Sequence, residues 1–171
     1  LMQLLKEQFP HISQFSMDLL AHEVLATPEV QQYCLEQFQS TNRKDIGIII
    51  FDPKHKFDMA FLEFKIYPII FEKLQLIFQQ NDKCFIEVPL LYEKGFQNFF
   101  DKTIVVSSPE DIRIERIKKR DNRSEEQIQQ IFKKQLPQHI KEQLADFLFI
   151  NDNQSNNFFD VSQFIEQNIN I

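Results

Sequence analysis

Three arginines in the second half of the chain are spaced so that they can bind an anion together. Arg113, Arg116 and Arg120 are separated by three and four residues, which places their guanidinium groups on one face of a helix. Guanidinium groups bind phosphate and carboxylate oxygens through paired hydrogen bonds. Because the whole chain has a net charge of -6, this local basicity indicates a small anionic ligand or, alternatively, a helix face exposed to solvent.

Polar or turn-forming residues follow three short apolar runs. Pro89, Ser107 and Asn151 come directly after residues 85–88, after residues 103–106 and after residues 147–150, respectively. Helical patterns lie between the runs, which therefore predict parallel strands joined by right-handed crossovers. Ligands bind beyond the carboxyl ends of the strands in such open sheets. We therefore expect these three residues to face one crevice.

The rest of the pattern predicts how helices surround these strands. Residues 1–8 have a helical rhythm, and residues 11–17 alternate like a strand that ends at Asp18. Thr27-Pro28 and Ser108-Pro109 are typical helix starts, and residues 124–127 form a capping box. Residues 27–80 therefore form a helical insertion between two strands, in which we expect Pro68 to separate two helices.

Length and composition exclude several classes of protein. With 171 residues and 43% hydrophobic content, the chain suits one domain with an inserted lobe. Its acidity argues against general nucleic-acid binding. No apolar run approaches the roughly 20 residues that span a bilayer, and no signal peptide opens the chain, so we expect a cytoplasmic protein with no membrane contact. Cys34 and Cys84 lie far apart in apolar patterns, which predicts buried thiols and no structural metal.

Glycine is unusually rare. Only Gly47 and Gly95 occur, so the printed residues contain no Gly-rich phosphate loop. Leu1, Met2, Leu4 and Leu5 already follow the rhythm of a helix, from which we expect that residues precede Leu1.

Six segments occur in an order that is more informative than any one of them. They are residues 16–24, 67–68, 88–93, 115–121, 135–137 and 145–151. Together they resemble the dephospho-coenzyme A kinase family over nearly the whole chain. The most specific part is Val-Pro-Leu-Leu-Tyr-Glu at 88–93, followed at a family-like distance by residues 116–121 and by Gln135.

The resemblance implies an α/β fold of the P-loop kinase type, a three-layer structure with a parallel sheet flanked by helices. The nucleotide-binding core would comprise residues 1–26 and 81–171, with a helical lid at about 120–136 and a helical acceptor-binding lobe at 27–80. The N-terminal strand and the phosphate loop would come just before Leu1. The implied reaction transfers the γ-phosphate of ATP, with Mg²⁺, to the ribose 3′-hydroxyl of dephospho-coenzyme A, the last step of coenzyme A synthesis. The implied protein is a monomer or small homo-oligomer.

The resemblance also implies roles for individual residues. Asp18 corresponds to an acidic residue near the acceptor hydroxyl, where a carboxylate can orient that hydroxyl and accept its proton; the alternative is a helix cap. Arg116 and Arg120 correspond to a pair that stacks on adenine and bridges phosphates, and Asn151 and Asn153 to the loop that holds adenine. The residues implied to bind the acceptor are Tyr67, Pro68, Pro89, Leu90, Leu91 and Glu93.

The sequence departs from the family pattern at four positions. Ser16, Tyr67, Asn42 and Asn153 stand where the family usually has Asp, His, Asp and Gly. Three functional hypotheses therefore remain open: an active dephospho-coenzyme A kinase whose upstream residues carry the phosphate loop, a non-catalytic relative that binds coenzyme A or a nucleotide, and a P-loop kinase with another small acceptor.

Overall fold

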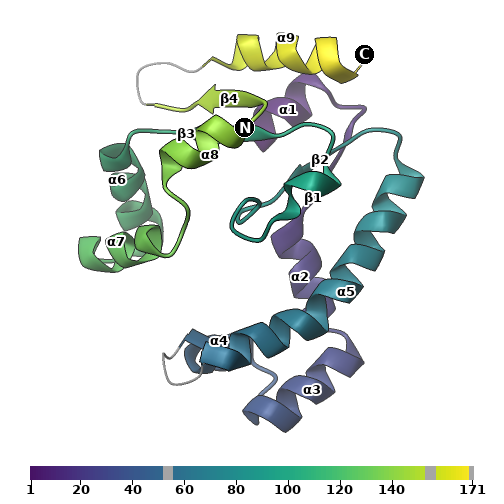
Figure 1. Ribbon diagram of the computed structural model, residues 1–171, viewed down its shortest axis with the longest axis vertical. Coiled ribbons are helices and arrows are strands. Elements are labelled where there is room, and N and C mark those ends of the chain that lie inside the picture. Colours follow the sequence, from purple (N-terminus) through teal and green to yellow (C-terminus); the bar gives the residue numbers. More distant parts are fainter. Residues whose placement is uncertain (52–55, 153–156, 170–171) are drawn as a thin grey trace. The chain divides into compact units, whose positions relative to one another are not determined.

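The computed structural model describes residues 1–51, 56–152 and 157–169 (Figure 1). The chain divides into two compact units. The first combines Leu1–His11 with Pro89–Ile171, and the second is Ile12–Val88. The predicted helical lobe, residues 27–80, falls entirely within the second unit, while its role in binding an acceptor stays a prediction.

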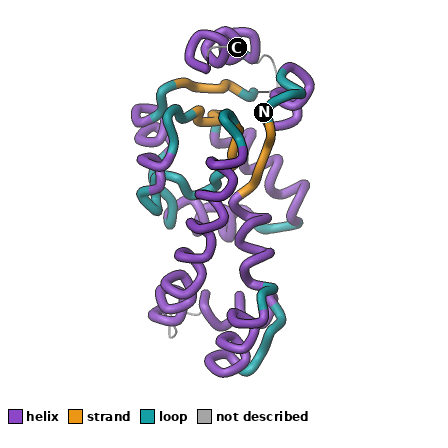
Figure 2. Tube along the Cα trace, turned by 90° about the vertical axis from the view of Figure 1, so that its right-hand side faces the viewer, coloured by secondary structure: helices purple, strands orange, loops and turns teal. Residues whose placement is uncertain are grey.

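The second unit is built on a pair of parallel strands. β1 (Ser13–Ser16) pairs with β2 (Cys84–Glu87) from Ser13 opposite Cys84 to Ser16 opposite Glu87. The connection between them consists of helices, as expected for a parallel crossover (Figure 2). These helices are α2 (Met17–Leu25), α3 (Pro28–Phe38), α4 (Arg43–Phe51) and α5 (Lys56–Gln80).

The start of α3 differs in one respect from the prediction. Pro28 is the first helical residue and Thr27 holds the N-cap position, but the Thr27 side chain does not cap the helix. Its hydroxyl instead donates a hydrogen bond to the carbonyl oxygen of Val24, at 2.8 Å, which joins α3 to the end of α2. Val30, Cys34 and Phe38 form the buried stripe of α3.

The separation of two helices at Pro68 was a wrong prediction. Pro68 lies inside α5, which continues unbroken for 25 residues. A proline costs a helix interior about 3 kcal/mol, because it lacks an N–H donor and its ring meets the preceding turn. Burying one large aliphatic side chain contributes about 1.5–3 kcal/mol. Burial of five such side chains therefore outweighs the proline, and these are Leu62, Ile66, Ile70, Leu74 and Ile77.

Replacing Pro68 with Ala is expected to stabilise the second unit. Alanine restores the missing backbone donor and is the best helix former, so we expect the free energy of unfolding to rise by roughly 1–3 kcal/mol. Urea unfolding of the variant and the wild type measures this difference. An unchanged or lower stability would contradict the assignment of Pro68 to a regular helix interior.

The first unit contains the other pair of parallel strands. β3 (Ile104–Ser107) pairs with β4 (Phe147–Ile150) from Ile104 opposite Phe147 to Ser107 opposite Ile150. The predicted parallel pairing is thus confirmed in both units. Between β3 and β4 come α6 (Glu110–Asp121), α7 (Glu125–Lys133) and α8 (Gln138–Leu144). The capping box at the start of α7 is also confirmed. The Ser124 hydroxyl accepts a hydrogen bond from the backbone N–H of Gln127, and the Gln127 side-chain oxygen accepts one from the backbone N–H of Ser124.

The core of this unit lies between β4 and α9 (Phe158–Ile169), which run side by side in Figure 1. Phe147 stacks on Phe164 with ring centroids 4.7 Å apart, and Phe149 meets Phe158 edge to face. Val161 and Ile165 are buried on the same helix. The remaining helix of the unit, α1 (Met2–Gln8), confirms the helical rhythm of the first residues.

The segment after β2 is a turn, although its residues 90–93, Leu-Leu-Tyr-Glu, form a helix-like pattern in the sequence. Lys94 N–H donates to the carbonyl of Leu90 at 3.1 Å, and Phe96 N–H to that of Leu91 at 2.9 Å. Gly95 then adopts a left-handed φ of 71°, which glycine tolerates because it has no Cβ. A short 3₁₀ helix, η2 (Phe96–Phe99), follows.

Candidate functional site

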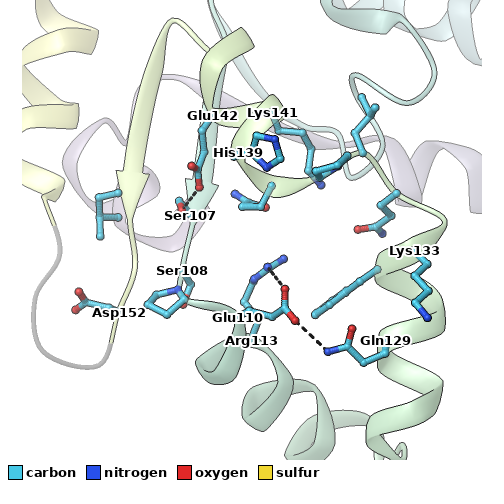
Figure 3. Close-up of a pocket in the computed structure, with 17 residues that line it drawn as sticks. Ser107, Ser108, Glu110, Arg113, Gln129, Lys133, His139, Lys141, Glu142 and Asp152 are labelled. Atoms are coloured by element: carbon cyan, nitrogen blue, oxygen red, sulfur yellow. Dashed lines mark hydrogen bonds and ion pairs between the residues drawn. The ribbon is translucent and has the colours of Figure 1, made fainter.

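A cavity of about 860 Å³ lies at the carboxyl ends of β3 and β4 (Figure 3). The strand-end residues Ser107 and Ile150 line it, together with Ser108 and Asp152, which follow them. The rest of the lining comes from α6, α7, α8 and the segment that joins α7 to α8. The cavity therefore occupies the strand ends at which the sequence predicted a crevice. Of the three residues expected there, Ser107 lines it, whereas Pro89 and Asn151 do not.

Charged side chains of both signs border this cavity. Arg113, Lys133 and Lys141 are the Arg and Lys residues of the lining, and Glu110, Glu142 and Asp152 are its carboxylates. Glu142 accepts a short hydrogen bond from the Ser107 hydroxyl. A lining of this kind offers a ligand both hydrogen-bond donors and hydrogen-bond acceptors.

Contacts between α6 and α7 shape the wall of the cavity. Gln129 donates a hydrogen bond to Glu110 at 3.0 Å, and an Arg113 amino group lies 3.7 Å from the other Glu110 oxygen. The Arg113 guanidinium also lies over the Phe132 ring, 4.7 Å from its centroid. These contacts fix the Arg113 side chain at the cavity wall.

Two buried polar atoms of the lining have no hydrogen-bond partner within the described part of the chain. They are the hydroxyl oxygen of Ser108, a residue only 8% exposed, and Nε of Arg113. The expectation that Ser108 caps α6 is wrong, because Pro109 holds the N-cap position. Both groups can donate a hydrogen bond, so they are suited to an acceptor atom of a ligand.

The structure brings together two of the residues predicted to bind ATP. An Arg116 amino group donates a hydrogen bond to the backbone carbonyl of Asn151 at 3.0 Å, and the Asn151 N–H donates to Ser107 at 2.8 Å. The loop after β4 is thereby tied both to α6 and to β3. Asn153, the other residue predicted in this loop, lies outside the described residues.

Arg120 occupies the last turn of α6, where its side chain is 75% exposed. Its guanidinium makes two hydrogen bonds to Asp121, of 2.7 and 2.9 Å. The hydrogen bond from Arg120 lowers the pKa of the Asp121 carboxyl below its ordinary value. Arg120 is thus a solvent-exposed cation at the start of the predicted lid.

Asp18 lies in the first turn of α2, directly after β1, and is exposed. The capping alternative for Asp18 is wrong, because Ser16 holds the N-cap position of that helix. A carboxylate in the first turn interacts favourably with the positive end of the helix dipole. Asp18 is thus accessible to solvent just beyond the carboxyl end of β1.

The predicted acceptor-binding residues are divided between the two units. Tyr67 and Pro68 belong to α5, and burial followed by the charge of Glu63 raises the pKa of the Tyr67 hydroxyl above its usual value. Pro89, Leu90, Leu91 and Glu93 belong to the turn after β2, in which Pro89 and Leu90 are exposed. Glu93 is mostly buried and is hydrogen-bonded within its own unit.

A second hydrogen-bonded carboxylate, Asp146, whose side chain is 35% exposed, holds the amino end of β3. Asp146 accepts hydrogen bonds from the Thr103 N–H at 2.8 Å and from the Thr103 hydroxyl at 3.0 Å, and it pairs with Lys102 at 3.2 Å. Burial acts to raise the pKa of Asp146, but the hydrogen bonds from Thr103 and Lys102 outweigh it. The pKa therefore lies below its ordinary value.

The lowered pKa of Asp146 predicts a pH dependence of stability. A carboxylate with a depressed folded-state pKa stabilises the protein above its unfolded pKa, about 3.9, and loses this contribution as the pH falls through the folded pKa. The difference in unfolding free energy between wild type and Asp146→Asn should thus be largest near neutral pH and shrink below about pH 4. Urea titrations across this range measure it, and a difference independent of pH would contradict the assignment.

Other sites were sought over the same described residues. No three His, Cys, Asp or Glu side chains come together there as a metal site, and no helix in residues 1–51, 56–152 or 157–169 is long and apolar enough to cross a membrane. Cys34 and Cys84 are not joined in a disulfide; Cys34 is buried, whereas Cys84 is partly exposed, contrary to the prediction of two buried thiols. Burial raises the pKa of the Cys34 thiol, which makes it less reactive.

Sequence reasoning missed the cavity role of Ser108, and it named Arg113 only as one of three arginines on a helix face that could bind an anion. The sequence did contain a signal for the cavity wall, because Glu110 and Arg113 lie three residues apart at the start of a predicted helix and can therefore form an ion pair on one face. Gln135, noted only as a family position, also lines the cavity.

Comparison with known proteins gives consistent matches. The family model described as dephospho-CoA kinase matches residues 16–157. The dephospho-CoA kinase of Campylobacter jejuni is 29% identical over 150 residues, which cover 81% of this chain and 75% of that protein. The enzyme of Coxiella burnetii is 34% identical over 114 residues, which cover 65% of this chain and 56% of that protein.

Two solved structures resemble the chain along its length. A crystal structure from Thermus thermophilus aligns with a TM-score of 0.78 at 21% identity, covering 98% of this chain and 87% of that one. This likeness concerns the fold alone. A Campylobacter jejuni dephospho-CoA kinase structure aligns with a TM-score of 0.63 at 26% identity, covering 98% of this chain and 89% of the other.

Proposed function

The chain belongs to the dephospho-CoA kinase family, whose members are ATP-dependent phosphotransferases, and we propose on this basis how its residues perform the reaction. The γ-phosphate of ATP is transferred to the ribose 3′-hydroxyl of dephospho-coenzyme A. The structural observation that carries the proposal is the hydrogen bond that joins Arg116 to the backbone of Asn151 beyond the ends of β3 and β4. Two residues 35 positions apart, both predicted to bind ATP, thus meet at one site.

The nucleotide would bind at these strand ends. Because Asn151 anchors one amino group of Arg116, the planar guanidinium has a set orientation, which suits stacking on a purine base. Ser108 and Arg113 add buried donor groups at the same strand ends. Arg120, one turn further along α6, would contact the phosphates when the segment at about 120–136 closes as a lid.

Asp18 would act on the acceptor. Its carboxylate would accept a hydrogen bond from the 3′-hydroxyl, hold it in line with the γ-phosphate and take its proton as the new P–O bond forms. Tyr67, Pro68, Pro89, Leu90 and Leu91 would border the acceptor. The Tyr67 hydroxyl can donate or accept a hydrogen bond.

Magnesium enters the proposal only as the ion that accompanies ATP. The described residues do not fit a protein-built magnesium site, because no three acidic or histidine side chains come together among them. Mg²⁺ is commonly held by one or two protein oxygens, phosphate oxygens and water, so it needs no such cluster. No step is assigned to a protein ligand of the ion.

Steady-state turnover tests this proposal. The full-length protein, with any residues that its gene encodes ahead of Leu1, is incubated with Mg-ATP and dephospho-coenzyme A, and ADP release is followed. We expect ADP release that depends on dephospho-coenzyme A and is much slower with AMP or adenosine as acceptor. Tight binding of dephospho-coenzyme A in calorimetry without any turnover would contradict the kinase assignment and support a binding protein.

A further inference from the structure

Glu93 is a mostly buried carboxylate whose partners lie far along the chain. Its side chain is 12% exposed and belongs to the turn after β2. One carboxylate oxygen accepts a hydrogen bond from the backbone N–H of Leu136 at 3.1 Å. The same oxygen lies 3.4 Å from the ammonium group of Lys141, whose side chain is 16% exposed.

These partners occupy the C-terminal end of the predicted lid. Leu136 stands between α7, which ends at Lys133, and Pro137, the N-cap residue of α8. Gln135, Leu136 and Lys141 all line the cavity at the ends of β3 and β4. A single carboxylate therefore fixes the backbone at the end of the lid and orients a cation at the cavity.

We propose that Glu93 is a positioning residue for the lid and does not itself contact the acceptor. A lid closes reproducibly only if its ends are held, and the Glu93 oxygen holds one end through Leu136. This inference rests on the proposed kinase function, because lid closure is the step that Glu93 would serve.

The energetics of Glu93 favour such a role over stability alone. Its second carboxylate oxygen is buried without a hydrogen-bond partner among the described residues. Buried ion pairs often give less stability than apolar residues of similar size, because both charges lose their hydration. A buried carboxylate with one unpartnered oxygen therefore contributes little to the stability of the fold. Its hydrogen bond to Leu136, however, sets the position of a specific backbone N–H group.

Asp146 provides a matched control. It too accepts a backbone N–H, that of Thr103, and pairs with a lysine, Lys102. However, it holds the amino end of β3 and lines no part of the cavity. Removing either carboxylate thus removes the same kinds of interaction, but only Glu93 is bonded to the lid.

The experiment compares Glu93→Ala, Glu93→Gln and Asp146→Ala in the full-length protein. Hydrogen exchange at residues 134–137 reports the backbone N–H groups of Lys134, Gln135 and Leu136, since Pro137 has none. Steady-state kinetics reports kcat and both KM values. For Glu93→Ala we expect exchange at 134–137 to be about tenfold faster, kcat to fall about fivefold, and KM for dephospho-coenzyme A to change less than about twofold. Glu93→Gln should recover most of both losses, because its amide oxygen can still accept from Leu136. Asp146→Ala should lower Tm without changing kcat or exchange at 134–137.

Three outcomes would overturn the inference. A higher KM for dephospho-coenzyme A in Glu93→Ala, with normal kcat and normal exchange at 134–137, would make Glu93 an acceptor contact. An equal loss of kcat in Asp146→Ala would make the Glu93 effect one of general stability. Exchange at 134–137 that stays at the wild-type rate in Glu93→Ala would exclude the positioning role. Because exchange needs no turnover, this last result decides the inference even if the proposed kinase function fails.

Discussion

Replacing Asp18 with Asn is expected to lower kcat for dephospho-coenzyme A by on the order of 10²-fold or more. The amide keeps the size and position of the side chain but cannot accept the proton of the 3′-hydroxyl. Because the carboxylate acts mainly after the substrates have bound, KM for dephospho-coenzyme A should change much less. Steady-state kinetics of the full-length variant measures both quantities.

Asp160→Asn is the matched control for this prediction. Asp160 is also an exposed aspartate in the first turn of a helix, α9, and so shares the interaction of Asp18 with the helix dipole. Both variants should lose a similar, small amount of stability, and only Asp18→Asn should lose activity. A kcat near that of the wild type would remove Asp18 from the chemistry.

Arg120→Ala should lower kcat/KM for ATP by about 30-fold or more while leaving the fold intact. A guanidinium that closes on the phosphates stabilises the charge that spreads over the transferring group. The side chain is 75% exposed, and its guanidinium pairs with the adjacent Asp121. Exposed pairs of this kind contribute at most about 1 kcal/mol, so Tm should change little.

Lys119→Ala serves as its control, because Lys119 is the neighbouring exposed cation in the last turn of α6. It should leave kcat/KM for ATP within about twofold, since a general loss of positive charge at an exposed site is largely screened by salt. If Arg120→Ala unfolds the protein yet spares ATP affinity, the pair with Asp121 is structural and the phosphate role is wrong.

Local sequence patterns predicted most of the secondary structure. The capping box at Ser124 and the strand from Ile104 could be recognised because their signals depend on residues within a few positions. The helix across Pro68 and the turn at 90–93 could not. In the helix, the burial of side chains along α5 outweighs the helix-breaking effect of Pro68. In the turn, the backbone hydrogen bonds to Leu90 and Leu91 outweigh the helix-like pattern of residues 90–93.

The site was predictable only in part, for a similar reason. The helical spacing of Arg116 and the strand end at Asn151 indicated two groups at one edge of a sheet, and these two groups are in contact. The partners of Glu93 lie 43 and 48 residues further along the chain, which no local pattern can reveal. The same holds for the cavity wall that Arg113 forms with Phe132 of the next helix.

Identification of the product tests the central claim most directly. The full-length protein is supplied with ATP labelled in its γ-phosphate and with dephospho-coenzyme A, and the position of the label in the product is determined by phosphorus NMR and mass spectrometry. We expect the label as a phosphomonoester on the ribose 3′-oxygen, in an amount equal to the ADP released. Label on another hydroxyl, or ADP release without labelled coenzyme A, would contradict the assignment of this chain as a dephospho-coenzyme A kinase.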